Sequence, residues 1–234
     1  MSSRLYCLFV LLGPVLLHSA DVPAAFRPGT QILFQGDSIT DGGRGWTADP
    51  NHILGQDYAY LIAAKYGAVL PERRLVFLNR GVGGNKVSDL VARWQTDTLD
   101  LKPDLLSILI GINDTSHDVP VEDFEKQYDK LLADTIAALP NVRIVLGEPF
   151  TLPVGKRKEN WEQWRAQVQL RQDVVRKLAT KYQTALIRYQ KMFDRACDRA
   201  PADYWIWDGV HPTYSGHQLM ADEWVRTVRE FWSK

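Results

Sequence analysis

Five short apolar runs, separated by segments of helical periodicity, limit the fold of this sequence more than any other feature. One of them, residues 105–110, reads Leu-Leu-Ser-Ile-Leu-Ile. Consecutive apolar positions are typical of strands buried on both faces, as in a parallel sheet. The five predicted strands are Gln31–Phe34, Leu75–Leu78, Leu105–Ile110, Arg143–Leu146 and Ala185–Tyr189.

Amphipathic helical patterns lie between and after these runs. Apolar residues recur every three to four positions, with charged residues opposite, in Phe124–Leu139, Trp161–Tyr182 and Met220–Phe231. We interpret Trp161 and Trp164, in the second pattern, as core residues. Alternating strands and helices imply parallel crossovers. We therefore predict an α/β protein, a three-layer α/β/α sandwich around a central five-stranded parallel sheet.

Composition narrows the class of protein further. A chain of 234 residues is of the size of one domain with a sizeable core, and we predict a single domain over residues 25–234. The formal net charge is zero, with 45% apolar and 24% charged residues. General nucleic-acid binders and membrane-surface proteins usually carry a basic excess, so the charge argues against both.

The N-terminal segment differs from the rest of the chain. Arg4 precedes the apolar run Leu5–Leu17, which small residues follow as far as Ala24. The run is about 13 residues long, whereas a spanning helix needs about 20. We interpret residues 1–24 as a signal peptide and predict export to the periplasm or the extracellular space.

Cysteine usage favours neither a disulfide nor a metal site. Cys7 lies within the predicted signal peptide, and its removal would leave Cys197 alone. The Cys-x-x-Cys and His-rich spacings of zinc sites are missing from the sequence. We therefore expect no metal and no cofactor.

Polar and glycine-rich segments follow the predicted strands. Ser38 follows the first strand, Gly84 the second and Asn113 the third, while Asp208 and His211 come after the fifth. Ligands of open parallel sheets bind outside the carboxyl ends of the strands. We therefore expect these residues to meet at one edge of the sheet.

These residue types are those needed for acyl transfer through serine. A serine hydroxyl is a weak nucleophile that needs a base within hydrogen-bond reach. Asp208 precedes His211 by three positions, which allows its carboxylate to orient the imidazole. Of the other histidines, His52 and His117 lack an acid at useful spacing, although either could line the pocket. We interpret His217 as a structural residue.

A developing oxyanion needs N–H donors fixed in advance. The backbone N–H groups of Ser38 and Gly84 and the side-chain amide of Asn113 are the candidates. Taken singly, each of these motifs is a common turn, and Asp208 with His211 could be a surface pair or half of a metal site. Their joint presence at successive strand ends favours a catalytic site.

The motifs Gly36-Asp37-Ser38-Ile39, Gly84, Gly111-x-Asn113-Asp114 and Asp208-x-x-His211-Pro212 together resemble the SGNH/GDSL hydrolase family. The resemblance implies a flavodoxin-like fold and ester hydrolysis without a metal. It also implies that Ser38 is the nucleophile, His211 the base and Asp208 its orienting acid, with Ser38, Gly84 and Asn113 forming the oxyanion hole.

Longer segments, such as residues 33–44 and 204–221, resemble the bacterial acetylxylan esterase branch of this family. That likeness implies the removal of acetyl groups from plant polysaccharides or their oligomers. Two roles are open for the nearby aromatic residues Trp46, Trp205 and Trp207. They either stack on the sugar rings of the substrate or line the core and the back of the site. The alternatives are a lysophospholipase or thioesterase of the same family, and a non-catalytic carbohydrate-binding protein on this fold.

Overall fold

The computed structural model describes residues 22–47 and 49–233. Most of the predicted signal peptide, residues 1–21, therefore lies outside the described residues, and that interpretation stays a prediction. The described chain begins just before Ala25 and Phe26, both of which are buried in the core.

Five parallel strands form one sheet in the order β2-β1-β3-β4-β5. The order reverses direction at β1, as it does in doubly wound flavodoxin-like sheets. The predicted parallel sheet is thus confirmed, with all five runs in it. The strands are β1 (Gln31–Gly36), β2 (Val76–Asn79), β3 (Leu105–Leu109), β4 (Arg143–Gly147) and β5 (Ala185–Ile187).

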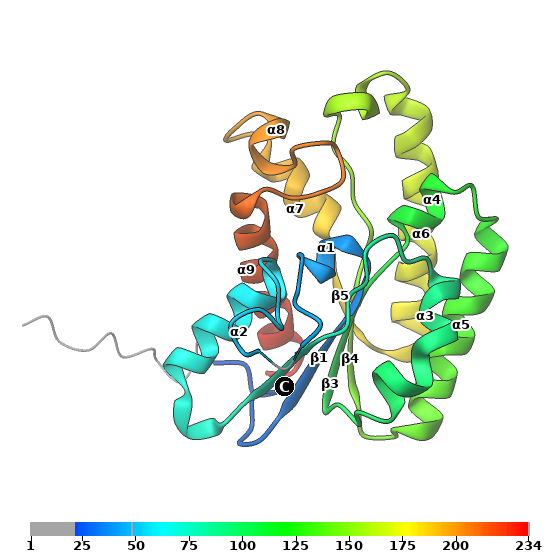
Figure 1. Ribbon diagram of the computed structural model, residues 1–234. Coiled ribbons are helices and arrows are strands. Elements are labelled where there is room, and N and C mark those ends of the chain that lie inside the picture. Colours follow the sequence, from blue (N-terminus) through cyan, green and yellow to red (C-terminus); the bar gives the residue numbers. More distant parts are fainter. Residues whose placement is uncertain (1–21, 48, 234) are drawn as a thin grey trace, which may run out of the picture.

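Helices cover both faces of the sheet, so the predicted three layers are confirmed. In Figure 1, α2 and α9 lie on one side of the strands, and α3, α5 and α6 on the other. The short helices α1 and α4 follow β1 and β3 directly. The helices are α1 (Ser38–Asp41), α2 (Tyr58–Val69), α3 (Val87–Trp94), α4 (Ile112–Ser116), α5 (Val121–Ala138), α6 (Trp161–Tyr182), α7 (Tyr189–Ala196), α8 (Ala202–Trp205) and α9 (Tyr214–Phe231), with short helical turns at Pro71–Arg73, Gln95–Leu99 and Gly155–Lys158, the last of which is η4.

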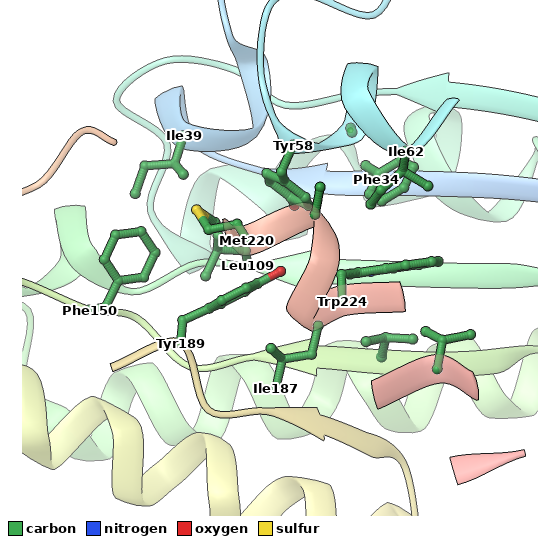
Figure 2. Packing of buried hydrophobic residues seen from close by; sticks show 14 of the residues in the cluster. Phe34, Ile39, Tyr58, Ile62, Leu109, Phe150, Ile187, Tyr189, Met220 and Trp224 are labelled. Atoms are coloured by element: carbon green, nitrogen blue, oxygen red, sulfur yellow. The ribbon is translucent and has the colours of Figure 1, made fainter. Parts of the chain in front are cut away.

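The larger core cluster contains a buried tryptophan. Trp224 of α9 packs against Phe34 of β1, with ring centroids 5.5 Å apart (Figure 2). Its indole N–H donates to the hydroxyl of Ser107 at 2.9 Å. Ser107 is the polar residue within the third apolar run, and this bond supplies the partner that a buried polar group requires.

The fifth strand is shorter than predicted. It ends at Ile187, and Tyr189 begins α7 instead of ending the strand. The ring of Tyr189 is buried against Phe150 and Tyr58 in the helix layer. The strand was predicted too long because Tyr189, the first residue of α7, is buried in the same way as Ile187 of β5.

Candidate active site

The turn after β1 places Ser38 at the carboxyl edge of the sheet. A Cβ on Gly36 would lie 2.5 Å from the carbonyl oxygen of Leu109 on the neighbouring strand, so the position requires glycine. Asp37 then caps α1, because its Oδ1 accepts a hydrogen bond from the N–H of Ile39 at 3.0 Å. Ser38, the first residue of α1, is left half-buried.

The structure brings Ser38, His211 and Asp208 together in one hydrogen-bonded row. Oγ of Ser38 lies 2.8 Å from Nε2 of His211, and Nδ1 of His211 lies 2.7 Å from Oδ2 of Asp208. The other oxygen, Oδ1, accepts hydrogen bonds from the backbone N–H groups of Val210 at 2.9 Å and His211 at 2.7 Å. This geometry suits proton transfer from the hydroxyl to an imidazole oriented by a carboxylate.

The surroundings of Asp208 keep its carboxylate charged. Partial burial alone would raise its pKa, but the hydrogen bonds from His211 and Val210 outweigh burial, so the pKa of Asp208 lies below its ordinary value. An ionised Asp208 accepts the Nδ1 proton of the imidazole. In an imidazole whose single proton is on Nδ1, Nε2 is the acceptor, and this atom faces Oγ of Ser38.

The candidate oxyanion donors lie beside this row. A Cβ on Gly83 would approach Cβ of Ser38 to 3.9 Å, so the Gly83-Gly84 turn passes next to the serine. Gly84 has a φ of 79°, a conformation that favours glycine. In the described part of the chain, the N–H groups of Ser38 and Gly84 donate to no acceptor. Nδ2 of Asn113 donates to the carbonyl of Asn85 at 3.1 Å, which leaves its second N–H available.

Two further residues, which the sequence analysis did not single out, hold the donor loop in place. Oδ2 of Asp41 accepts a hydrogen bond from the N–H of Gly83 at 2.9 Å. Buried Asn79 accepts from the N–H of Gly81 at 2.8 Å and donates to the Thr40 carbonyl at 2.5 Å. Both side chains therefore tie the β2–α3 loop to the turn that carries Ser38. Only their positions in the sequence could have pointed to them: Asp41 ends the short helix after β1, and Asn79 is the last residue of β2.

Two buried carboxyls lie behind the site. Burial raises the pKa of Asp37 to about 7, and its Oδ2 has no hydrogen-bond partner among the described residues. Burial likewise raises the pKa of Asp114 to about 6, and its carboxyl accepts from the N–H of Val87 at the start of α3. Both carboxyls thus take part in fixing the turns that carry Ser38 and Asn113.

The remaining histidines lie apart from the hydrogen-bonded row. His52 does have an acid partner, because its Nδ1 lies 2.8 Å from Oδ2 of Asp49, three residues earlier; the expectation that it lacked one was wrong. This pair is exposed at the surface. His117 contacts the carbonyl of Asn113 through Nδ1 at 2.8 Å. Burial lowers the pKa of His217 to about 4, which agrees with its structural interpretation.

The tryptophans divide into core and surface. Trp205 is 5% exposed, whereas Trp46 is 71% and Trp207 is 65% exposed. The ring of Trp207 is roughly parallel to that of His211, with centroids 6.4 Å apart. The prediction that Trp161 and Trp164 are core residues was wrong for Trp161, which lies in neither core cluster, and only partly right for Trp164, which is half-buried against the edge of the larger one.

Across residues 22–47 and 49–233, no group of three or more His, Cys, Asp and Glu side chains is arranged to hold a metal ion. Cys197 is partly buried with a free thiol, and burial raises its pKa. None of the described helices has the length and apolar character needed to cross a membrane.

Comparison with known proteins identifies the class that this fold and site define. Residues 34–219 match the GDSL-like lipase/acylhydrolase family, and the chain belongs to that family. It is accordingly a carboxylic ester hydrolase with the SGNH hydrolase fold. The predicted resemblance is confirmed.

Individual relatives are similar over nearly the whole chain. An acetylxylan esterase of Geobacillus stearothermophilus is 30% identical over 216 residues, which cover 87% of this chain and 96% of that enzyme. Its crystal structure superposes with a TM-score of 0.76. The structure of a protein from Parabacteroides merdae described as a GDSL-like lipase has a TM-score of 0.82 at 39% identity, covering 86% of this chain and 96% of that one. An α/β hydrolase from the metagenome of Lake Arreo has a TM-score of 0.76 at 34% identity, covering 87% and 97%.

Proposed function

We propose that this protein is a serine esterase that removes O-acetyl groups from plant-type polysaccharides or oligosaccharides such as acetylated xylan. The observation that carries the proposal is the continuous row from Ser38 through His211 to Asp208, with contacts of 2.8 and 2.7 Å. The row lies at the carboxyl edge of the sheet, where ligands of such folds bind.

In the proposed mechanism, Nε2 of His211 takes the hydroxyl proton of Ser38 as Oγ attacks the acetyl carbonyl carbon. The carbonyl oxygen becomes an oxyanion, which the N–H groups of Ser38 and Gly84 and the amide of Asn113 stabilise. His211 returns the proton to the sugar oxygen as its bond to the acetyl carbon breaks, which leaves an acetyl-serine. Water, deprotonated by His211, then attacks the carbonyl carbon of this ester. The bond from that carbon to Oγ breaks as His211 returns the proton to Oγ, which releases acetate and free Ser38.

Two observations support a carbohydrate ester as the substrate. The acetylxylan esterase of Geobacillus stearothermophilus is similar over 87% of this chain. Trp207, 65% exposed, stands beside the imidazole of His211, where an aromatic face can pack against a sugar ring.

Acetate release from a panel of acetylated xylan, acetylated pectin and peracetylated sugars tests the substrate class. The proposal predicts release from xylan or its oligomers, and a preference for acetyl over octanoyl groups on simple esters. A preference for octanoyl or longer esters would instead indicate a lysophospholipase or thioesterase. The absence of hydrolysis of any ester would indicate a non-catalytic binding protein.

We also propose that the protein is exported through a signal peptide in residues 1–24. Polymeric substrates remain outside the cell, so export agrees with the proposed activity. Expression of the full chain in a bacterial host, followed by cell fractionation and N-terminal sequencing, tests this part. Activity confined to the cytoplasm with an uncleaved N-terminus would contradict it.

A further inference from the structure

We infer that a polar pocket between α4 and the start of α6 is a subsite for a sugar ring of the substrate, beyond the ring that carries the scissile acetyl group. The pocket has a volume of about 220 Å³, and Ser116, Asp118, Arg157, Asn160, Gln163 and Trp164 line it. The inference rests on the proposed function, because it names the part of the site that would recognise an oligosaccharide.

Two elements that form the pocket also contact the candidate active site. One wall is α4, which also carries Asn113, and α4 packs against α6 (Figure 1). The other wall is η4, on which a Cβ at Gly155 would lie 3.5 Å from the carbonyl oxygen of Asp208. A Cβ at Gly209 would lie 2.6 Å from Cγ of Arg157. The η4 turn therefore packs directly on the loop that positions Asp208 and His211.

A chain of polar contacts links the pocket to that loop. The indole N–H of Trp164 donates to Oγ1 of Thr151 at 2.8 Å, and this hydroxyl donates to the carbonyl of Gly209 at 2.8 Å. The guanidinium of Arg157 lies over the Trp164 ring, 3.5 Å from its centroid, and donates to Oγ of Ser116 at 3.4 Å. These contacts fix the pocket relative to the catalytic row.

The lining offers the groups that pair with sugar hydroxyls. The carboxamides of Asn160 and Gln163 make no side-chain hydrogen bond within the described part of the chain, and each supplies donors and an acceptor. Asp118 adds a carboxylate acceptor. Only one of the five N–H groups of Arg157 has a hydrogen-bond partner among the described residues. Pyranose hydroxyls, which both donate and accept, match this set.

The same lining disfavours a fatty acyl chain. An alkyl chain in this pocket would remove three carboxamides, a carboxylate, an ammonium and a guanidinium from water without replacing their hydrogen bonds. A sugar ring replaces these bonds and also presents C–H groups to the exposed part of Trp164. The chemistry of the pocket thus selects a carbohydrate.

The test compares the wild type with the double variant Asn160→Ala/Gln163→Ala on three substrates: a small acetyl ester, an acetylated xylose and acetylated xylo-oligosaccharides. Asn160 makes no side-chain capping bond to α6, so its loss leaves the helix intact. Ser38, His211 and Asp208 do not line the pocket, so kcat/KM for the small ester reports folding and chemistry. The subsite predicts a KM for the oligosaccharides raised about tenfold, with kcat little changed, because two hydrogen bonds are lost.

The matched control is Gln127→Ala/Gln169→Ala, which removes two carboxamides on α5 and α6 that do not line the pocket. It should behave as the wild type on all three substrates. If the wild type hydrolyses oligosaccharides and the Asn160→Ala/Gln163→Ala variant does so with the same KM, the subsite is wrong while the proposed function stands. A wild type that cleaves the small ester but neither saccharide would refute the proposed function, and the subsite with it.

Discussion

Asp41, the last residue of α1, accepts through Oδ2 a 2.9 Å hydrogen bond from the N–H of Gly83. The contact joins segments 42 residues apart in the sequence. Next to it, a Cβ on Gly81 would lie 2.3 Å from the backbone nitrogen of Asp41, so the two backbones touch. The turn that carries Ser38 and the turn that carries Gly84 therefore form one unit, in which the two backbone donors keep a fixed separation.

Replacing Asp41 tests this positioning role. Asp41→Ala should lower kcat for a small acetyl ester by up to about a hundredfold with little change in KM, because the Gly84 N–H would shift from the oxyanion. Asp41→Asn keeps an acceptor oxygen and should recover most of kcat. A purely structural role predicts a lower melting temperature with normal kcat in the folded protein. Measuring kcat, KM and thermal unfolding on the three proteins decides between the two.

Asn113 is predicted to act mainly in the transition state. Loss of one oxyanion donor costs about a hundred- to a thousandfold in kcat, so Asn113→Ala should show a decrease of that size with KM little changed. Because Nδ2 also donates to the Asn85 carbonyl at 3.1 Å, the variant should melt somewhat earlier as well. A full kcat in the folded variant would show that the side chain only braces the loop.

Asp208→Asn should retain the fold but lose activity. The new amide would donate its N–H to Nδ1 of His211, so the ring proton would move to Nε2. A protonated Nε2 cannot accept the hydroxyl proton of Ser38. By analogy with other serine hydrolases, we expect kcat to fall by about ten-thousandfold. Steady-state kinetics with circular dichroism tests this expectation, and a variant within tenfold of the wild type would contradict the orienting role.

His217 should make stability depend on pH. Its pKa is lowered from the ordinary 6.5 to about 4 in the folded chain, so between these values only the unfolded chain binds the proton. The free energy of unfolding therefore decreases as the pH falls, by roughly 1.5 kcal/mol between pH 6.5 and pH 5.

Urea unfolding of the wild type and of His217→Gln at both pH values measures this contribution. The buried carboxyls Asp37, Asp57 and Asp114, whose pKa values burial raises, are common to the two proteins and cancel in the comparison. We expect the wild type to lose the larger amount of stability on acidification. Equal losses in the two proteins would mean that His217 does not titrate in this way.

The layers of the fold could be predicted because each strand is apolar over consecutive positions. Helix α2 gave no amphipathic pattern, since its sequence, Tyr-Ala-Tyr-Leu-Ile-Ala-Ala-Lys-Tyr-Gly-Ala-Val, is apolar nearly all round. Helix α3 has only 8 residues, too few for a clear period. Both were therefore missed, although each covers the sheet.

The row of Ser38, His211 and Asp208 could be predicted because its residues lie in recognisable loop motifs, one directly after β1 and the other between α8 and α9. The contact of Asp41 with Gly83 could not, because it depends on how two loops pack after the sheet has formed. Trp164 shows the same limit: its helical spacing was right, but its exposure is set by where η4 and Arg157 lie. Periodicity predicts which face of a helix is apolar, but it does not predict which segments pack against that face.

Acetate release from acetylated xylan by the wild type and by Ser38→Ala tests the proposed serine esterase activity most directly. The hydroxyl of Ser38 is the proposed nucleophile, and among the described residues its one side-chain hydrogen bond is with His211. We therefore predict that the variant keeps its melting temperature while acetate release falls at least about a thousandfold. A folded Ser38→Ala protein that retains most of the acetate release would contradict the role of Ser38 as the nucleophile.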